Sequence, residues 1–492
     1  MTTLDTPTLL DAGTWSGQVF DGRWRQAEGG DAPVTEPATG DELARIGIAS
    51  PGDVAASVTA AAEAQREWAR TSHEERAAVL RKAGDLFVAH AEEIEGWIMR
   101  ESGGIPPKAQ LETHVAQQEC WEAAALPSRP WGELLATAKP RLSMARRIPV
   151  GVVGVIAPFN FPIILAIRSV APALALGNAV VLKPDPRTAV CGGVSIARVF
   201  EEAGLPAGVL HVLPGGADAG QALVEAPEAR VISFTGSTAA GRKVGEAAGR
   251  LLKRAHLELG GNSAMIVLDD ADLDAAVSAA AFGSFIHQGQ VCMTTGRHIV
   301  ADAIADEYAD RLAEKASHLP VGDPSREQVA LGPIIDEGQR DNVHRLVEAS
   351  REAGATIAAG GSFEGLFYRP TVVTGVTADT PVWANEVFGP VAPITRFSSL
   401  DEAVSLAVGT EYGLSLGILT RDVMKAYALA DRIPSGLVHI NDQTVDDEAN
   451  APFGGVAASG TGSRFGGAAA NVEAFTETQW LTMQGDIAPY PF

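Results

Sequence analysis

Three side chains that lie far apart in the sequence have the chemistry needed for a covalent reaction at a carbonyl carbon. Cys292 lies among small, mostly uncharged residues, and a thiolate is the strongest nucleophile that a side chain offers near neutral pH. Glu258 precedes two glycines and could serve as a base that activates water. Asn160 lies in a loop bounded by prolines and offers a side-chain N–H to an oxyanion. The set predicts a nucleophile, a base and a hydrogen-bond donor.

Each of these residues, taken alone, also has a structural explanation. A single Cys is often a buried core residue, and an Asn in a turn often bonds the turn itself. We expect Glu258 to follow a helical segment, where an acidic side chain opposes the helix dipole. That misfit slightly favours a functional carboxylate, and the presence of all three residues in one chain favours catalysis.

Two further features predict a binding site for a dinucleotide. The apolar strand predicted at 230–234 runs into small residues at 235–241 that begin a helix, and such a turn lets backbone N–H groups approach a phosphate. Lys183 follows another predicted strand, at the end where ligands bind in open α/β sheets. The turn is not the usual G-x-G-x-x-G, and a tight turn and a solvated lysine remain the structural alternatives.

The elements that must position these residues are alternating strands and helices. Apolar strands are predicted at 152–157, 179–182, 209–213 and 230–234, separated by helical segments, which indicates a buried parallel sheet. A second α/β region begins near Leu259. The fold class predicted is therefore α/β, with a Rossmann-like parallel-sheet dinucleotide-binding domain, an α/β catalytic domain and a small β element for oligomerisation.

This pattern also predicts how the chain divides into domains. Residues 131–148 and the C-terminal stretch look extended and could pair with another subunit. The predicted parts are an NAD(P)-binding domain at 1–130 and 149–258, a catalytic domain at 259–445, extended oligomerisation segments at 131–148 and 471–492, and a segment at 446–470 that returns to the active-site side.

Composition narrows the class of protein and its location. The 492 residues carry a net charge of −23, which argues against a nucleic-acid partner because phosphate backbones are bound by clustered Lys and Arg. Three widely separated cysteines suit a reducing compartment and form no metal motif. The start, Met1–Asp5, has no signal-peptide pattern. The uncharged run 148–167 contains three prolines, so we expect a strand, a turn and a helix rather than a membrane span. We expect a cytoplasmic protein without a metal.

Seven short motifs occur in order along most of the chain. They are Pro158-Phe159-Asn160-Phe161-Pro162, Lys183-Pro184, Phe234-Thr235-Gly236-Ser237, Glu258-Leu259-Gly260-Gly261, Gly289-Gln290-Val291-Cys292, Glu386-Val387-Phe388-Gly389-Pro390 and Pro452-Phe453-Gly454-Gly455. Each motif alone is weak, but in this order the set is highly specific. The chain resembles the aldehyde dehydrogenase superfamily over essentially its whole length.

The resemblance implies a mechanism. Cys292 attacks an aldehyde, and the oxyanion is held by the amide of Asn160 and the backbone N–H of Cys292. Hydride passes to a nicotinamide and leaves a thioester, which water activated by Glu258 hydrolyses to the acid.

The resemblance also implies the residues that bind the cofactor. Lys183 would contact the adenosine ribose, Gly236 and Ser237 the pyrophosphate, Glu386 the nicotinamide ribose and Phe388 the nicotinamide ring. Pro158 and Phe159 complete the expected cofactor-binding set.

Two positions depart from the family pattern. Many NAD-preferring members carry a Glu three residues after the strand-end Lys, where it repels a 2′-phosphate, but this chain has Pro186 there. We therefore expect NADP to be accepted as well as NAD. Some members have an acid near residues 462–466 that assists proton movement. This chain has Ser463, Arg464 and Phe465, so no such relay is expected.

The substrate pocket implied by the resemblance is largely apolar. Its expected lining is Phe161, Ile164, Ile167, Phe285 and His287. A semialdehyde with a distal carboxylate would want an Arg, and Arg168 is a poor candidate because we expect it to face away from the pocket.

Stretches at 437–444, 183–188 and 490–492 resemble the benzaldehyde and vanillin dehydrogenase branch of the superfamily, which implies an aromatic aldehyde substrate and a homodimer or homotetramer. A semialdehyde or aliphatic aldehyde dehydrogenase, a CoA-acylating dehydrogenase and a non-catalytic nucleotide-binding protein remain alternatives. The presence of Glu258 counts against the CoA-acylating enzyme, and the retained Cys292, Glu258 and Asn160 count against a non-catalytic protein.

Overall fold

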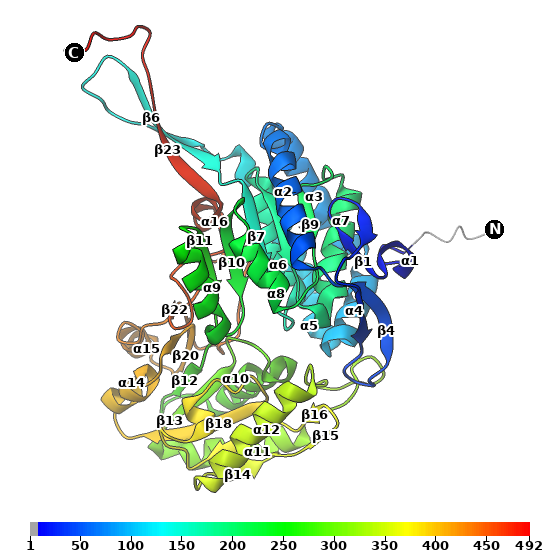
Figure 1. The fold of residues 1–492 in the computed structure, drawn as a ribbon. Coiled ribbons are helices and arrows are strands. Elements are labelled where there is room, and N and C mark those ends of the chain that lie inside the picture. Colours follow the sequence, from blue (N-terminus) through cyan, green and yellow to red (C-terminus); the bar gives the residue numbers. More distant parts are fainter. Residues whose placement is uncertain (1–7) are drawn as a thin grey trace.

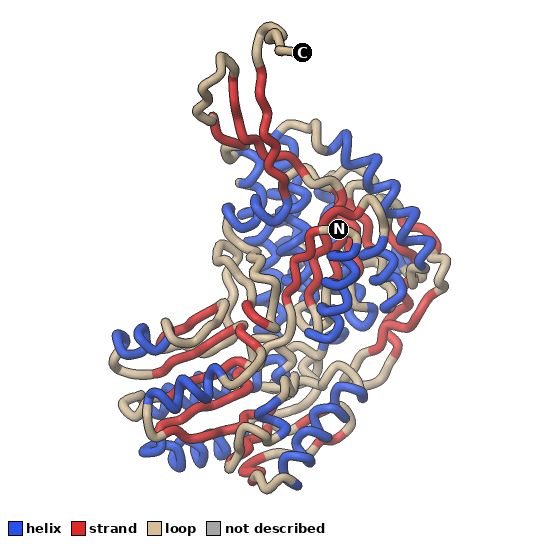
Figure 2. Tube along the Cα trace, turned by 60° about the vertical axis from the view of Figure 1, so that its left-hand side comes forward, coloured by secondary structure: helices blue, strands red, loops and turns tan. Residues whose placement is uncertain are grey.

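A computed structural model describes residues 8–492. The stretch Met1–Asp5, in which we expect no signal peptide, lies outside the described residues. The chain forms two α/β bodies and an arm that projects from the first body (Figure 1). Figure 2 shows that strands lie among helices in both bodies. The predicted α/β class is confirmed.

The first body is built on a seven-stranded sheet of order β11-β10-β7-β8-β9-β1-β2. The strands from β11 to β9 are parallel, and the β1–β2 hairpin joins β9 in antiparallel fashion. Every residue of β7 and β8 is buried, as expected for a sheet covered on both faces. The strands are β1 (Gln18–Phe20), β2 (Trp24–Gln26), β7 (Val152–Ile156), β8 (Ala179–Lys183), β9 (Leu210–Val212), β10 (Ala229–Thr235) and β11 (Arg254–Glu258).

Helices surround this sheet, and their starts follow from the local sequence. At α2 and α3, Ser50 with Asp53 and Ser72 with Glu75 form capping boxes that satisfy backbone N–H groups in the first turn. The helices are α1 (Ala12–Trp15), α2 (Pro51–Trp68), α3 (His73–Ala89), α4 (Ala91–Ser102), α5 (Pro106–Ala124), α6 (Pro162–Ala175), α7 (Ser195–Ala203), α8 (Ala217–Glu225) and α9 (Thr238–Arg250). A separate two-stranded ladder pairs β3 (Asp31–Thr35) with β4 (Glu42–Gly47).

The uncharged run 148–167 forms the predicted strand, turn and helix, in β7 and α6. Within residues 8–492, no helix combines the length and the apolar character needed to cross a bilayer.

The second body is built on another seven-stranded sheet, of order β14-β17-β18-β13-β12-β20-β21. It is parallel except for β14 at one edge. Its strands are β12 (Ser263–Val267), β13 (Thr295–Ala301), β14 (Thr356–Ala359), β17 (Thr371–Thr374), β18 (Val391–Phe397), β20 (Ser415–Leu419) and β21 (Leu437–Ile440). Its helices are α10 (Leu273–Phe285), α11 (Ala305–His318), α12 (Glu337–Glu352), α13 (Pro381–Ala384), α14 (Leu400–Val408) and α15 (Val423–Ala430). Small two-stranded ladders pair β15 (Phe363–Glu364) with β16 (Phe367–Tyr368) and β19 (Tyr412–Gly413) with β22 (Val456–Ala457).

The arm is a three-stranded antiparallel sheet of order β23-β6-β5. It consists of β5 (Gly132–Leu134), β6 (Leu142–Pro149) and β23 (Thr476–Met483), and the C-terminus lies at its tip (Figure 1). The prediction that 471–492 is extended is wrong at its start, because α16 (Ala468–Phe475) is helical. The buried Phe475 and Ala474 anchor this helix in the core of the first body, and the chain becomes extended only beyond it.

The expectation that Glu258 follows a helix is also wrong. Helix α9 ends at Arg250, and Glu258 is the last residue of strand β11. The change of direction occurs at Leu252, which adopts a left-handed φ of 56°. The residue with the left-handed φ is a Leu rather than the usual Gly or Asn, so the sequence does not mark the position of the turn in the usual way.

Candidate active site

The largest concentration of the expected site residues lines a cavity of about 470 Å³ at the carboxyl ends of the parallel strands of the first body. Ligands bind at this edge in open α/β sheets. The cavity is lined by all seven residues expected to bind the cofactor and by two of the three expected catalytic residues: Pro158, Phe159, Lys183, Gly236, Ser237, Glu386 and Phe388, with Asn160 and Cys292.

Cys292 is presented by a strained segment that follows α10. His287 and Gln288 adopt left-handed φ values of 48° and 57°, and Gly289 continues this conformation. Non-glycine residues rarely adopt it, and such strain often accompanies function. A Cβ on Gly289 would lie 2.1 Å from the carbonyl oxygen of Gly389, so this position requires glycine. The segment leaves Cys292 half-buried, on the wall of the cavity.

Asn160 is buried and held against the same segment. Its Nδ2 donates a hydrogen bond of 2.8 Å to the carbonyl oxygen of Gln290. An Asn side chain has two N–H groups, so this bond fixes the amide and leaves a second N–H for another acceptor. Asn160 and Cys292 also line a second, narrower cavity, which places donor and thiol at the junction between the two cavities.

The surroundings of Cys292 favour the protonated thiol over the thiolate. Burial raises its pKa to about 12, and the charges of Glu386 and Glu258 contribute to the rise. Nucleophilic attack therefore requires that the thiol proton be removed.

The carboxyl group of Glu258 lies beside the site but lines neither of the two cavities. Its Oε2 accepts a 3.2 Å hydrogen bond from the backbone N–H of Gly455, and its Oε1 is buried without a hydrogen-bond partner in the described part of the chain. Burial raises the pKa of Glu258 to about 8, and the Gly455 N–H, Arg168 and Arg464 oppose that rise. A rotation of this side chain is needed to bring the carboxylate into a cavity that Cys292 lines.

The carboxyl group of Glu386 lies against two adjacent glycines at the wall of the cavity. Its Oε1 accepts a 3.0 Å hydrogen bond from the N–H of Gly261, and a Cβ on Gly260 would lie only 2.2 Å from its Oε2. Burial raises the pKa of this carboxyl to about 7. The carboxyl group of Glu386 can occupy this place at the cavity because Gly260 has no side chain.

The cavity has the groups that a dinucleotide requires. The ammonium group of Lys183 lies at the end of β8 and donates to the carbonyl oxygen of Gly215 at 2.8 Å, and Ser237 caps α9. Phe159 and Phe388 meet edge to face, with centroids 5.9 Å apart. A further cavity of about 750 Å³ between α8 and α9 shares Lys183 and Ser237 with the first. Together they form an extended groove with a helix N-terminus for phosphate, so the residues present fit a nicotinamide dinucleotide.

The second cavity at Cys292 is narrow, about 90 Å³, and mostly apolar. Phe161 and Ile164 line it, as expected, but Ile167, Phe285 and His287 do not. Ile167 points into the core of the first body, and Phe285 belongs to a core cluster of the second body. His287 is fully buried behind Phe161, with ring centroids 5.4 Å apart.

Arg168 lines this cavity, contrary to the expectation that it faces away. Leu165 and Arg168 follow Phe161 at helical spacing, so they share one face of α6 with Ile164. The guanidinium pairs with Asp447 and lies 4.4 Å from the centroid of the Phe453 ring. The spacing of four residues at i, i+3, i+4 and i+7 was the sequence signal that could have revealed Leu165 and Arg168.

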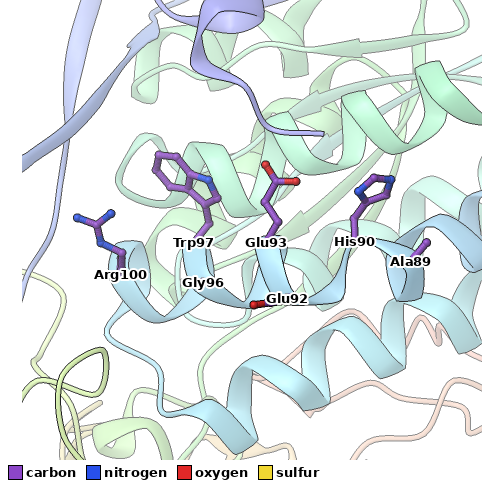
Figure 3. A pocket seen from close by; sticks show the side chains of 7 residues that line it. All are labelled: Ala89, His90, Glu92, Glu93, Gly96, Trp97 and Arg100. Carbon is purple, nitrogen blue, oxygen red and sulfur yellow. The ribbon is translucent and has the colours of Figure 1, made fainter. Parts of the chain in front are cut away.

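Another hollow lies along α4, where His90, Glu93, Trp97 and Arg100 project from one side of the helix (Figure 3). Glu93 accepts hydrogen bonds from the N–H groups of Leu9 and Leu10. This hollow shares no lining residue with the cavities at Cys292.

Comparison with known proteins agrees with this geometry. The family model described as "Aldehyde dehydrogenase family" matches residues 24–481. A vanillin dehydrogenase of Amycolatopsis sp. is 71% identical over 99% of this chain and 100% of its own length. A benzaldehyde dehydrogenase [NAD(+)] of Pseudomonas putida is 52% identical over 97% of this chain and 98% of its own. A solved structure of a salicylaldehyde dehydrogenase from Pseudomonas putida G7 superposes with a TM-score of 0.93 at 35% identity, covering 96% of this chain and 99% of that one. The chain belongs to the aldehyde dehydrogenase family.

Proposed function

We propose that this enzyme oxidises aromatic aldehydes of the benzaldehyde type to carboxylic acids, with NAD or NADP as the oxidant. The observation that carries the proposal is the position of Cys292 and Asn160, where the cofactor-sized cavity meets a narrow apolar one. The names of the relatives support the substrate class, since vanillin, benzaldehyde and salicylaldehyde are all aromatic aldehydes.

In the first half of the reaction, the thiol proton of Cys292 passes to solvent water, the sulfur bonds to the aldehyde carbon and the carbonyl oxygen becomes an oxyanion. The free N–H of Asn160 and the backbone N–H of Cys292 stabilise this charge. Conversion of this adduct to a thioester on Cys292 needs a hydride acceptor beside the aldehyde carbon, which bound NAD(P) would supply. Lys183, Gly236 and Ser237 would hold its adenosine and pyrophosphate, while Glu386, Phe388, Pro158 and Phe159 would hold its nicotinamide half.

In the second half, Glu258 accepts a proton from water as the water oxygen attacks the thioester carbon. The acid leaves and the thiol of Cys292 is restored. Glu258 is suited to this role because its Oε1 lacks a hydrogen-bond partner among residues 8–492 and only one bond, to Gly455, holds the carboxyl aside.

A coenzyme and aldehyde screen tests the proposal. We expect benzaldehyde to have a higher kcat/KM than succinic semialdehyde or hexanal, because the cavity beyond Cys292 is narrow and mostly apolar. Absorbance of the reduced nicotinamide follows each reaction. Saturation with succinic semialdehyde and little turnover of benzaldehyde would support the semialdehyde alternative instead.

The same screen tests coenzyme choice. We expect NAD and NADP to differ in kcat/KM by less than about tenfold, which is roughly 1.4 kcal/mol. Pro186 supplies no carboxylate to repel a 2′-phosphate, and the neighbouring Asp185 is neutralised by two hydrogen bonds from Arg187, of 2.8 and 2.9 Å. A strong, exclusive preference for NAD would refute this expectation.

We also propose that the arm joins subunits into a homodimer or homotetramer. Leu134 and Trp480 on the arm are 74% and 65% exposed, and exposed apolar patches often mark interfaces. We expect the double variant Leu134→Asp/Trp480→Asp to have a smaller mass in light scattering than the wild type. The control Leu252→Asp changes a Leu that is 91% exposed on the first body and should leave the mass unchanged. A wild-type monomer would contradict the proposal.

The division into domains remains part of this proposal. It assigns 1–130 and 149–258 to cofactor binding and 259–445 to catalysis, with 446–470 returning to the site. The last assignment is supported by the hydrogen bond from Gly455 to Glu258 and by the backbone bond from Leu259 N–H to the carbonyl oxygen of Ser459.

A further inference from the structure

We propose that Arg168 and Asp447 form a subsite that binds a hydroxyl group on the substrate ring, at a position across the ring from the aldehyde. This inference rests on the proposed function and narrows its substrate class to ring-hydroxylated aromatic aldehydes.

Arg168 lies on the face of α6 that lines the narrow cavity, farther along the helix than the other lining residues of that helix. Phe161, Ile164, Leu165 and Arg168 line this cavity from one face of the helix. A helix rises about 1.5 Å per residue, so Arg168 lies roughly 10 Å along the axis from Phe161. A ring bonded through its aldehyde carbon to Cys292 would therefore direct its far edge at Arg168.

The hydrogen-bonding groups of the pair match a hydroxyl. Arg168 is 2% exposed and uses Nη2 to bind Oδ2 of Asp447. Over residues 8–492, its Nε and Nη1 find no acceptor, and Oδ1 of Asp447 finds no donor. A hydroxyl group both accepts and donates, so it can accept from Arg168 and donate to Asp447. A methyl group in the same place would leave these buried groups unsatisfied, which is costly.

The surrounding charges favour a neutral hydroxyl over a carboxylate. Asp447, Glu119 and Glu258 act together on Arg168, and although burial opposes them, they raise the pKa of its guanidinium. Burial raises the pKa of Glu119 to about 8. Asp447 already pairs with this one cation, so the distal carboxylate of a semialdehyde would have to compete with Asp447 for it. Most of the remaining wall is apolar, and a single polar pair in such a wall fixes the orientation of a ligand.

The test compares two ring substituents of similar size. For the wild type, we expect 4-hydroxybenzaldehyde to exceed 4-methylbenzaldehyde in kcat/KM by about tenfold or more. The double variant Arg168→Met/Asp447→Leu removes both charges of the pair together, because removing one alone leaves a buried charge unpaired. We expect it to lower the hydroxyl-to-methyl ratio by about tenfold or more. The ratio is the measure because any effect of the two changes on Glu258, whose pKa Arg168 influences, acts on both substrates alike.

A matched control and a milder variant complete the test. Ile167→Val changes the neighbouring residue on the opposite, core-facing side of α6 and should leave the ratio unchanged. Arg168→Lys keeps the charge but loses the planar fork, so it should lower the ratio even if the double variant fails to fold. Binding of 4-hydroxybenzaldehyde to Cys292→Ala, with and without the double change, gives a calorimetric measure that is independent of catalysis.

The outcomes separate the two proposals. If no aromatic aldehyde is oxidised by the wild type, the proposed function fails. If aromatic aldehydes are oxidised but neither Arg168 variant lowers the hydroxyl-to-methyl ratio, the subsite is overturned. A loss confined to 2-hydroxybenzaldehyde would also overturn it, because the ortho position lies next to the aldehyde.

Discussion

Replacing Cys292 with alanine is expected to lower kcat by about 10⁴-fold or more, because no other side chain on the cavity walls can form the thioester. The loss should affect every aldehyde and both coenzymes alike. Binding of NADH, measured by fluorescence, should persist, because the groups expected to hold the cofactor are unchanged. Turnover is measured from the absorbance of the reduced nicotinamide.

The matched control for this prediction is Cys120→Ala. Cys120 is another free thiol, but it is buried in α5 and lines neither cavity. We expect this variant to keep most of its activity. Turnover by Cys292→Ala within tenfold of the wild type would revive the view that the chain is a non-catalytic nucleotide-binding protein.

Much of the site was predictable because its elements carry strong local signals. The apolar runs at 152–156 and 179–183 are buried on both faces, which is typical of a parallel sheet covered by helices. Lys183 and the turn at Gly236 end such strands, so the edge of the sheet brings them together. The motifs then placed Cys292 and Glu386 at the same cavity, although they lie in the other α/β body.

The residues that were missed depend on contacts between distant segments. The sequence does not show which face of its helix Arg168 lies on. Its ion-pair partner, Asp447, lies far away in the sequence. Ile167 has the apolar character of a pocket residue, but the turn of α6 directs it into the core. His287 lies close to Cys292 in sequence, yet its left-handed backbone turns it behind Phe161. Composition and periodicity do not encode these directions.

For Glu258, the predicted secondary structure was wrong, but the residue does lie near the other expected site residues. We expected the carboxylate at the end of a helix, but β11 carries it, and its strand pairs with β10 so that Glu258 lies opposite Thr235. The edge of the sheet is therefore what places the base near the cofactor cavity. The following Leu259 and Gly260 line that cavity while the carboxyl itself rests against Gly455.

This resting position leads to the second large effect, which is expected for Glu258→Gln. We expect one equivalent of NAD(P)H per active site to form in a burst, followed by steady-state turnover that is slower by about 10²- to 10⁴-fold. Thioester formation needs Cys292 and Asn160, and the thiol proton can pass to solvent water. Hydrolysis needs a base, and Gln cannot accept a proton from water. Stopped-flow absorbance measures the burst, and mass spectrometry should show the acyl group on the peptide that contains Cys292.

The pH dependence of the wild type gives an independent check on the same residue. Because burial raises the pKa of Glu258 to about 8, the carboxylate that acts as base becomes populated as the pH rises through that value, and the rate of thioester hydrolysis should rise with it. Glu258→Gln should lose this pH-dependent rise. The control Glu348→Gln, which changes a carboxylate on α12 outside both cavities, should keep it. A burst-free Glu258→Gln enzyme with wild-type turnover would show that another group activates the water.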